Sequence, residues 1–251
     1  MKFQERSALI LAELGQKPSV SAEELSRKLQ VSLVTIRKDL NQMDRDGLLI
    51  RTFGGATACS VSKAQQTRMA ALQIIARGVS DCIEDGDSLI LDAGSTTLLA
   101  ARWLLQKEQL KVITNSLPIG LELCRHEEIQ LILLGGDLNS SGVFTYGKDA
   151  VRQLEQYKAR KLILSVSGVS CSSGLTTRHS GLPELFRKMI ERSHEVIVVA
   201  DDTKIGFESF SHICDLDAVD RIITNWNPDS EPELQRMEAR GIQVTRCREE
   251  G

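Results

Sequence analysis

Several common patterns are missing from this sequence, and each absence excludes a class of protein. No stretch of the 251 residues approaches the ~20 consecutive apolar residues that a membrane-spanning helix requires. Residues 1–16 contain charged side chains where a secretory signal has an uninterrupted apolar segment. We therefore expect a cytoplasmic protein without a membrane anchor.

Patterns typical of metal and nucleotide sites are also missing. The six cysteines are far apart and include no C-x-x-C pair, which excludes a zinc ribbon and a disulfide framework, so reduced thiols are expected. The four histidines have no metal-ligand spacing. The glycine-rich segments match neither the G-x-x-x-x-G-K-[ST] pattern of nucleoside triphosphatases nor the G-x-G-x-x-G pattern of dinucleotide-binding folds. We expect no metal and no cofactor.

The charge is unevenly distributed in a chain of otherwise ordinary composition. Apolar residues make up 41% and charged residues 26%, as in soluble globular proteins, and the length suits two domains. The net charge is −3, yet residues 1–57 hold nine cations and seven anions, or +2, which leaves −5 for the remainder. A mildly basic N-terminal region on an acidic body is compatible with a DNA-contacting end.

The N-terminal region has the pattern of a helix-turn-helix. Apolar residues at helical spacing predict a first helix over residues 5–14, with Gly15 as its C-cap. A capping box at residues 21–24 predicts a short second helix that ends near Gln30. A third helix is expected over residues 33–44, after a two-residue turn, as in helices that enter the major groove of DNA.

A β-wing is expected directly after this third helix, which should end at Gly47. Residues 48–57 have the pattern of a strand, a Gly54-Gly55 turn and a second strand. Arg51 would then lie beside the duplex backbone or in the minor groove. From the pattern alone, an ordinary small helical domain with scattered cations remains an alternative.

The rest of the chain predicts an α/β domain with a largely parallel sheet covered on both faces. We place a winged helix-turn-helix at residues 1–58, a linker at 59–67 that is either flexible or the start of the next helix, and the larger domain at 68–251. Strands are expected at 88–91, 112–114, 130–134, 162–165, 196–200, 221–224 and 242–245. Helices are expected at 69–83, 98–105, 119–124, 150–157, 183–191 and 231–240.

Small and polar loops follow four of the expected strands, at the edge where parallel sheets bind ligands. In the first loop, Gly94 would let the backbone approach an anion, and residues 95–97 would supply hydroxyls and helix amides. Lys204 could add a positive charge. The alternative is a well-capped helix start and a solvated lysine, but several such loops at one edge favour a ligand site.

Motifs of a known family are spread along essentially the whole chain. They include V-S-x-x-T-I-R-K-D-L at 31–40, G-L-L-x-R-x-x-G-G-A at 47–56, D-x-G-S-T-T at 92–97, T-N-S at 114–116 and D-x-x-K at 201–204. In these motifs the sequence resembles the DeoR family of bacterial sugar-metabolism regulators. The resemblance implies operator contacts by Ser32, Thr35, Arg37, Lys38 and Arg51. To this set we add Arg6, Ser21, Leu33, Gly54 and Gly55.

The resemblance also implies the function of the larger domain, which in this family is similar to ribose-5-phosphate isomerase and coenzyme A transferase folds. It implies a phosphorylated sugar or polyol as inducer, repression that the ligand relieves, and a dimer or tetramer on double-stranded operator DNA. The expected effector-binding residues are Asp92, Gly94, Ser95, Thr96, Thr97, Asn115, Ser116, Gly135, Gly136, Thr176, Asp201 and Lys204.

The chain departs from the family pattern in one region. Where the family commonly has aspartates around one strand, this chain has Arg160, Ser167 and Ser170, and Leu182 stands where the family often has a glutamate. Carboxylates accept hydrogen bonds from sugar hydroxyls, so these differences predict a different choice of effector.

Two other functions are compatible with parts of the pattern. A sugar-phosphate isomerase-like enzyme fused to a DNA-binding domain would need a carboxylate base, for which Asp92 or Asp201 is available. A structural nucleoid protein predicts a more uniformly basic chain and does not explain the clustered polar loops. A transcriptional regulator explains both ends of the sequence.

Overall fold

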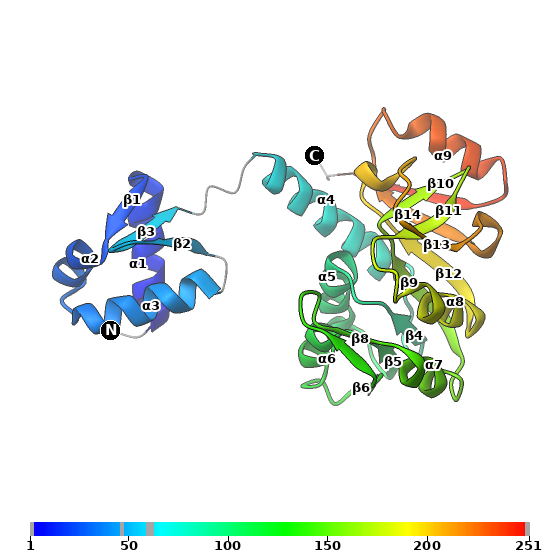
Figure 1. Ribbon diagram of the computed structural model, residues 1–251, viewed down its shortest axis with the longest axis horizontal. Coiled ribbons are helices and arrows are strands. Elements are labelled where there is room, and N and C mark those ends of the chain that lie inside the picture. Colours follow the sequence, from blue (N-terminus) through cyan, green and yellow to red (C-terminus); the bar gives the residue numbers. More distant parts are fainter. Residues whose placement is uncertain (1–2, 46–47, 59–62, 249–251) are drawn as a thin grey trace. The chain divides into compact units, whose positions relative to one another are not determined.

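The structure is a computed structural model that describes residues 3–45, 48–58 and 63–248 (Figure 1). The chain divides into two compact units, Met1–Gln66 and Thr67–Gly251, and each is described by itself. Of the expected linker, residues 59–62 lie outside the described residues. Residues 63–67 belong to helix α4 (Lys63–Ser80), because Lys, Ala and Gln are good helix formers.

The first unit is a winged helix-turn-helix. Its elements are α1 (Phe3–Gln16), β1 (Ser19–Ser21), α2 (Ala22–Leu29), α3 (Leu33–Arg45), β2 (Leu49–Thr52) and β3 (Gly55–Ala58). The three strands form an antiparallel sheet in the order β1-β3-β2, so the expected wing gains a third strand. The hydroxyl of Ser21 accepts a hydrogen bond from the Glu24 amide and caps α2, as the capping box predicted.

Two helix ends of the first unit concern the sequence predictions. The expected C-cap at Gly15 is wrong, because α1 continues to Gln16 and the Lys17 amide still donates to the Glu13 carbonyl. The expected end of the third helix at Gly47 lies outside the described residues. The core between the three helices and the sheet includes Ile10, Leu14, Leu25, Ile36, Leu40, Met43 and Leu49.

The second unit is built on a seven-stranded parallel sheet in the order β15-β14-β12-β9-β4-β5-β6. Its strands are β4 (Ser88–Leu91), β5 (Leu110–Thr114), β6 (Ile129–Leu133), β9 (Ala159–Ser165), β12 (Ser193–Val199), β14 (Arg221–Asn225) and β15 (Gln243–Cys247). Each matches one expected strand to within a few residues. The strand order reverses between β4 and β9, since β5 and β6 extend the sheet one way and β9 to β15 the other.

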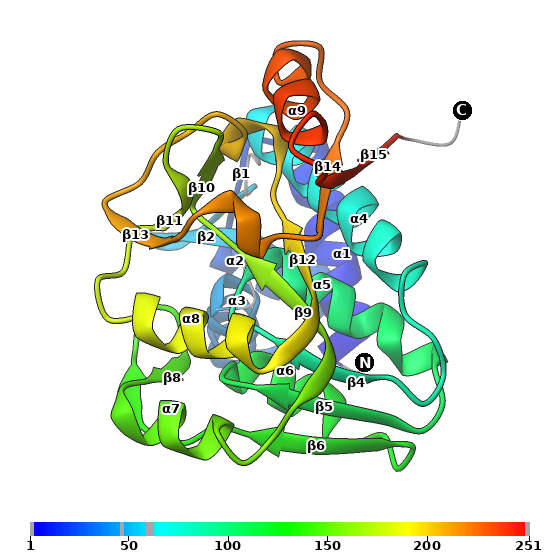
Figure 2. The ribbon, with the colours of Figure 1, turned by 90° about the vertical axis from the view of Figure 1, so that its right-hand side faces the viewer.

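Alternating side chains of the central strands fill two separate cores. Leu89 and Leu91 of β4 pack with α4, α5 (Ser95–Trp103) and α6 (Leu117–Leu123), whereas Ile90 faces the other side. There it packs with α7 (Lys148–Leu154), α8 (Pro183–Glu191) and α9 (Glu231–Glu238). Figure 2 shows these layers around the twisted sheet. The doubly covered parallel sheet is therefore confirmed.

Two small antiparallel sheets were not predicted. A hairpin is formed by β7 (Asp137–Asn139) and β8 (Phe144–Tyr146). A three-stranded sheet contains β10 (Gly168–Ser170), β11 (Gly174–Thr177) and β13 (Ser211–Cys214). Both add side chains to the carboxyl edge of the parallel sheet. Within the described residues, no helix has the length and apolarity needed to cross a membrane.

Candidate functional sites: a DNA-binding surface and a ligand pocket

The outer face of α3 presents hydroxyl and cationic side chains. Ser32 caps the helix, since its hydroxyl accepts a hydrogen bond from the Thr35 amide and lies 2.8 Å from the Thr35 hydroxyl. Arg37 and Lys38 are exposed, and neither has an ion pair within the described part of the chain. Unpaired cations next to a helix N-terminus suit contacts with DNA phosphates.

Two apolar side chains on this side of the unit were not predicted. Val34 is 74% exposed on the first turn of α3, and Phe53 is fully exposed at the tip of the wing. Leu33, which was expected to face DNA, instead packs partly against the core. Apolar groups at a recognition helix can contact thymine methyl groups, so Val34 belongs among the candidate contacts.

Arg6 and Arg51 occupy positions different from those of Arg37 and Lys38. The Arg6 guanidinium donates to both carboxylate oxygens of Asp39, at 2.6 and 3.0 Å, and both side chains are mostly buried. Arg51 in the wing is half-buried, and its amide donates to Asp44. The structure therefore gives Arg6 a role in holding α1 against α3.

The wing turn depends on glycine. Gly54 has a φ of +90°, which favours glycine. A Cβ at Gly55 would lie 2.0 Å from the Val20 carbonyl oxygen, so β1 and β3 can approach only when residue 55 is glycine. Both glycines thus shape the wing.

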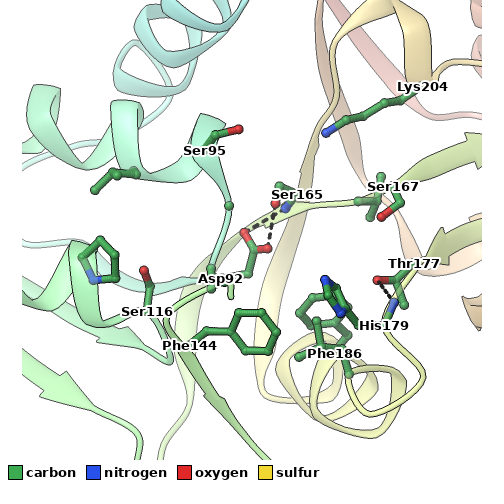
Figure 3. A pocket seen from close by; sticks show the side chains of 17 residues that line it. Asp92, Ser95, Ser116, Phe144, Ser165, Ser167, Thr177, His179, Phe186 and Lys204 are labelled. Carbon is green, nitrogen blue, oxygen red and sulfur yellow. Dashed lines mark hydrogen bonds between the residues drawn. The ribbon is translucent and has the colours of Figure 1, made fainter. Parts of the chain in front are cut away.

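A cavity of about 330 Å³ lies at the carboxyl edge of the sheet, where the strand order reverses between β4 and β9. Ligands of parallel α/β sheets bind at such switch points. Figure 3 shows Asp92 and Ser165, from the ends of β4 and β9, side by side in its base. The location agrees with the edge that the polar loops predicted.

Asp92 is buried at the base of this cavity. Its carboxylate accepts hydrogen bonds from the Ser165 amide at 2.9 Å and the Ser165 hydroxyl at 2.8 Å. Burial raises the pKa of Asp92 to about 6, although these hydrogen bonds and the positive charge of Lys204 favour the ionised form. The carboxyl group therefore titrates close to neutral pH.

Lys204 supplies a cation on the opposite wall. Its ammonium lies 3.8 Å from Asp201 Oδ2, and burial lowers its pKa while Asp201 and Asp92 oppose that effect. The same Asp201 oxygen lies 4.0 Å from Arg68 Nε on α4. In Figure 3 the Lys204 ammonium and the Ser95 hydroxyl point toward the same part of the cavity. This end of the cavity suits an anion.

The expected effector residues fall into two groups. Those that line the cavity are Asp92, Gly94, Ser95, Ser116 and Lys204. The others, Thr96, Thr97, Asn115, Gly135, Gly136, Thr176 and Asp201, are not in its lining.

Most of the second group have structural contacts instead. The Thr97 hydroxyl donates to the Asp92 carbonyl and accepts from the Gly94 amide, so it fixes the first loop. The Asn115 side-chain amide donates to the Thr145 carbonyl. Gly136 has a φ of +124°, and a Cβ there would lie 2.3 Å from the Tyr146 carbonyl oxygen. These residues hold the loops around the cavity in place without lining it themselves.

Several lining residues were not predicted. Ser165 ends the expected strand 162–165 and Ser167 follows it, so the rule that placed the other loops at this edge would also have placed these two residues there. Phe144, Thr177 and His179 belong to or follow the small antiparallel strands, for which the sequence gives little signal.

Fold and sites together define a ligand-responsive DNA-binding regulator. A model of the DeoR-like helix-turn-helix domain matches residues 6–62, and a model of the DeoR C-terminal sensor domain matches residues 68–226. The chain belongs to the DeoR family of helix-turn-helix transcriptional regulators.

Known relatives extend over almost the whole chain. The HTH-type transcriptional repressor GlcR of Bacillus subtilis is 34% identical over 91% of both chains. The glycerol-3-phosphate regulon repressor of Escherichia coli is 31% identical over 91% of this chain and 93% of its own. These relatives are transcriptional repressors, so the enzyme alternative is set aside.

Solved structures with similar folds have low sequence identity. The tetrameric eIF2B-beta2-delta2 complex from C. thermophilum matches with a TM-score of 0.51 at 15% identity and covers 94% of this chain and 72% of that one. A D-ribose-5-phosphate isomerase in complex with phospho-erythronic acid matches with a TM-score of 0.39 at 18% identity, over 53% of this chain and 52% of that one.

Proposed function

We propose that the chain represses an operon for the catabolism of a sugar or polyol, and that a phosphorylated sugar or polyol releases it from its operator. The observation that supports this most is the cavity at the switch point, with Lys204 on one wall and the start of α5 on another. A phosphate there would meet a cation and the free amides of a helix N-terminus.

The first turn of α5 offers further donors to such a phosphate. Ser95 lines the cavity, and its hydroxyl points toward the same part of the cavity as the Lys204 ammonium (Figure 3). Asp92 and Ser116 line the base, where they would accept hydrogen bonds from hydroxyl groups of the sugar. The glycerol-3-phosphate regulon repressor, a relative of similar length, supports a phosphorylated ligand.

For the operator, we propose that α3 enters the major groove. Val34 and Thr35 would then lie toward base edges, and Arg37 and Lys38 toward phosphates. The wing would place Phe53 and Arg51 beside the duplex. Regulators of this kind read repeated half-sites as symmetric oligomers, so a homodimer or homotetramer is part of the proposal.

Thermal denaturation of the full chain tests the ligand proposal. A panel of sugar phosphates, polyol phosphates and their unphosphorylated forms is added, because a ligand that binds the native state raises its melting temperature. We expect stabilisation by a phosphorylated compound, and little by its unphosphorylated form.

Lysine variants locate the binding site. Lys204→Ala should lose most of this stabilisation, whereas Lys188→Ala is the matched control, since Lys188 is also mostly buried beside a carboxylate but lies outside the cavity. The proposed site is wrong if no phosphorylated compound raises the melting temperature. It is also wrong if the compound raises the melting temperatures of Lys204→Ala and Lys188→Ala by the same amount.

A further inference from the structure

A second cavity, of about 240 Å³, adjoins the first. Phe144, His179 and Leu182 line both cavities and so form a shared wall. The second cavity is otherwise lined by Asn139, Tyr146, Arg178, Ser180 and Gly181. It lies between the β7–β8 hairpin and the loop that joins β11 to α8.

The shared wall is an ordered aromatic cluster. The His179 ring packs edge-on against Phe144 with centroids 5.5 Å apart, and Phe144 packs in the same manner against Tyr146 at 6.1 Å. The His179 amide donates to the Thr177 hydroxyl at 3.3 Å, which fixes the start of the loop. In Figure 3 His179 lies on the side of the first cavity that is formed by Thr177 and Phe186.

The lining of the second cavity carries positive charge without a carboxylate, whereas the first cavity holds Lys204 and one carboxylate. No carboxylate lines the second cavity, and Arg178 is exposed there without an ion pair in the described part of the chain. Asp92 is the one carboxylate in the lining of the first cavity, and it already accepts two hydrogen bonds from Ser165. Arg178 also lowers the pKa of Lys204, so their positive charges are close enough to repel each other.

We propose that the effector has two anionic groups, one held at Lys204 and the start of α5, and the other at Arg178 in the second cavity. The chemical class is a sugar bisphosphate or a phosphorylated sugar acid, with the sugar carbons lying along the shared wall. This inference rests on the proposed function and specifies the ligand of the same region. The first cavity alone has the volume of a small ligand site, so a monophosphate would leave the second cavity and Arg178 without a partner.

Matched pairs of ligands test the second anionic group. Calorimetric titration of the full chain compares fructose 6-phosphate with fructose 1,6-bisphosphate, glucose 6-phosphate with glucose 1,6-bisphosphate, and glucose 6-phosphate with 6-phosphogluconate. In at least one pair we expect the compound with two anionic groups to bind at least tenfold more tightly. If the bisphosphate and the sugar acid both bind more tightly than their monophosphate partners, the second cavity recognises negative charge in general. If only one of them binds more tightly, the second anionic group is a phosphate or a carboxylate accordingly.

Variants of Arg178 locate the second group. Arg178→Ala should reduce the affinity for the preferred compound at least tenfold and that for its monophosphate partner less than threefold, and Arg178→Lys should retain part of the preference. Arg152→Ala, a change at an exposed arginine on α7 outside both linings, is the control and should leave both affinities unchanged.

Two results would overturn the inference and keep the proposed function: equal affinities within every pair, or an Arg178→Ala variant that weakens both partners equally, which would place Arg178 at the same phosphate as Lys204. A different result, no binding by any phosphorylated compound, would contradict the proposed function and this inference with it.

Discussion

Asp92 combines complete burial with a carboxyl group that titrates near neutral pH. It follows the central strand β4, and the hydrogen bonds from Ser165 join the two strands at which the sheet order reverses. A buried carboxylate is costly, and its hydrogen bonds compensate for only part of that cost, so its pKa is raised to about 6. Above that pH, the ionised Asp92 carboxylate at the base of the cavity destabilises the folded chain.

The pH dependence of stability should reveal this charge. Below about pH 4 Asp92 is protonated in both folded and unfolded chains, and between about pH 4 and about pH 6 only the folded chain keeps the proton. The contribution of Asp92 to the free energy of unfolding therefore falls as the pH rises, by about 3 kcal/mol in total for a shift of about two pKa units. Asp92→Asn cannot titrate and lacks this dependence.

Urea unfolding of the sensor unit at several pH values measures the difference. The free energy of unfolding of Asp92→Asn minus that of the wild-type chain should rise by about 3 kcal/mol between about pH 4 and about pH 7. Parallel curves for the two proteins would show that Asp92 has an ordinary pKa.

The cations of α3 give a prediction for DNA binding. Arg37→Ala combined with Lys38→Ala removes two exposed, unpaired charges, so operator affinity should fall by at least about 100-fold and the slope of log affinity against log salt should decrease by about two. Fluorescence anisotropy with a duplex selected from random sequences measures both. The melting temperature should not change, and Arg125→Ala in the sensor unit is the control. Normal affinity in the double variant would exclude α3 as the recognition helix.

Among the elements, the wing sheet depends on close approach at Gly55. A methyl group there would meet the Val20 carbonyl, which is backbone and cannot rotate away, so Gly55→Ala should destabilise the DNA-binding unit by about 2 kcal/mol or more. Gly15→Ala is the comparison, because a Cβ at Gly15 has open space in helix α1 and should stabilise the unit by up to about 1 kcal/mol. Urea unfolding monitored by circular dichroism compares the two. Equal stabilities would mean that β1 does not need this contact.

The elements that could be predicted are those whose apolar residues form a continuous run or recur at helical spacing. The five inner strands of the parallel sheet each contain a run of buried apolar residues, and α8 was predicted at its observed bounds, Pro183–Glu191. The strands of the small sheets are three or four residues long, and β7 and β10 contain polar residues or glycine. Tertiary contacts hold these strands in place, and no local pattern in the sequence indicates them.

The same distinction between local patterns and tertiary contacts explains which residues of the site could be predicted. Asp92, Ser95 and Lys204 could be predicted, because they follow strands whose carboxyl ends must meet at one edge. His179 and Phe144 could not, since they reach the cavity from segments whose course depends on the small sheets. Arg6 was expected at the DNA, but its partner Asp39 is 33 residues away in sequence, and that pairing is not visible in a linear pattern.

The whole chain combines two units with different tasks. The helix-turn-helix binds DNA, and the sensor domain provides a cavity whose lining suits a phosphorylated ligand. Helix α4 begins the sensor unit, and its Arg68 lies 4.0 Å from Asp201, the carboxylate beside Lys204. If ligand and operator bind with coupled affinities, each must change the affinity for the other by the same factor, because coupling between sites is reciprocal.

The operator affinity of the full chain, measured with and without the phosphorylated compound that stabilises it most, shows whether the ligand releases the protein from DNA. Anisotropy titrations at fixed salt should show at least a tenfold loss of affinity at saturating ligand, and the Lys204→Ala variant should show no loss caused by the ligand. An operator affinity that stays the same when the cavity is saturated would contradict a repressor released by its ligand, because the bound ligand would then have no effect on the DNA-binding unit.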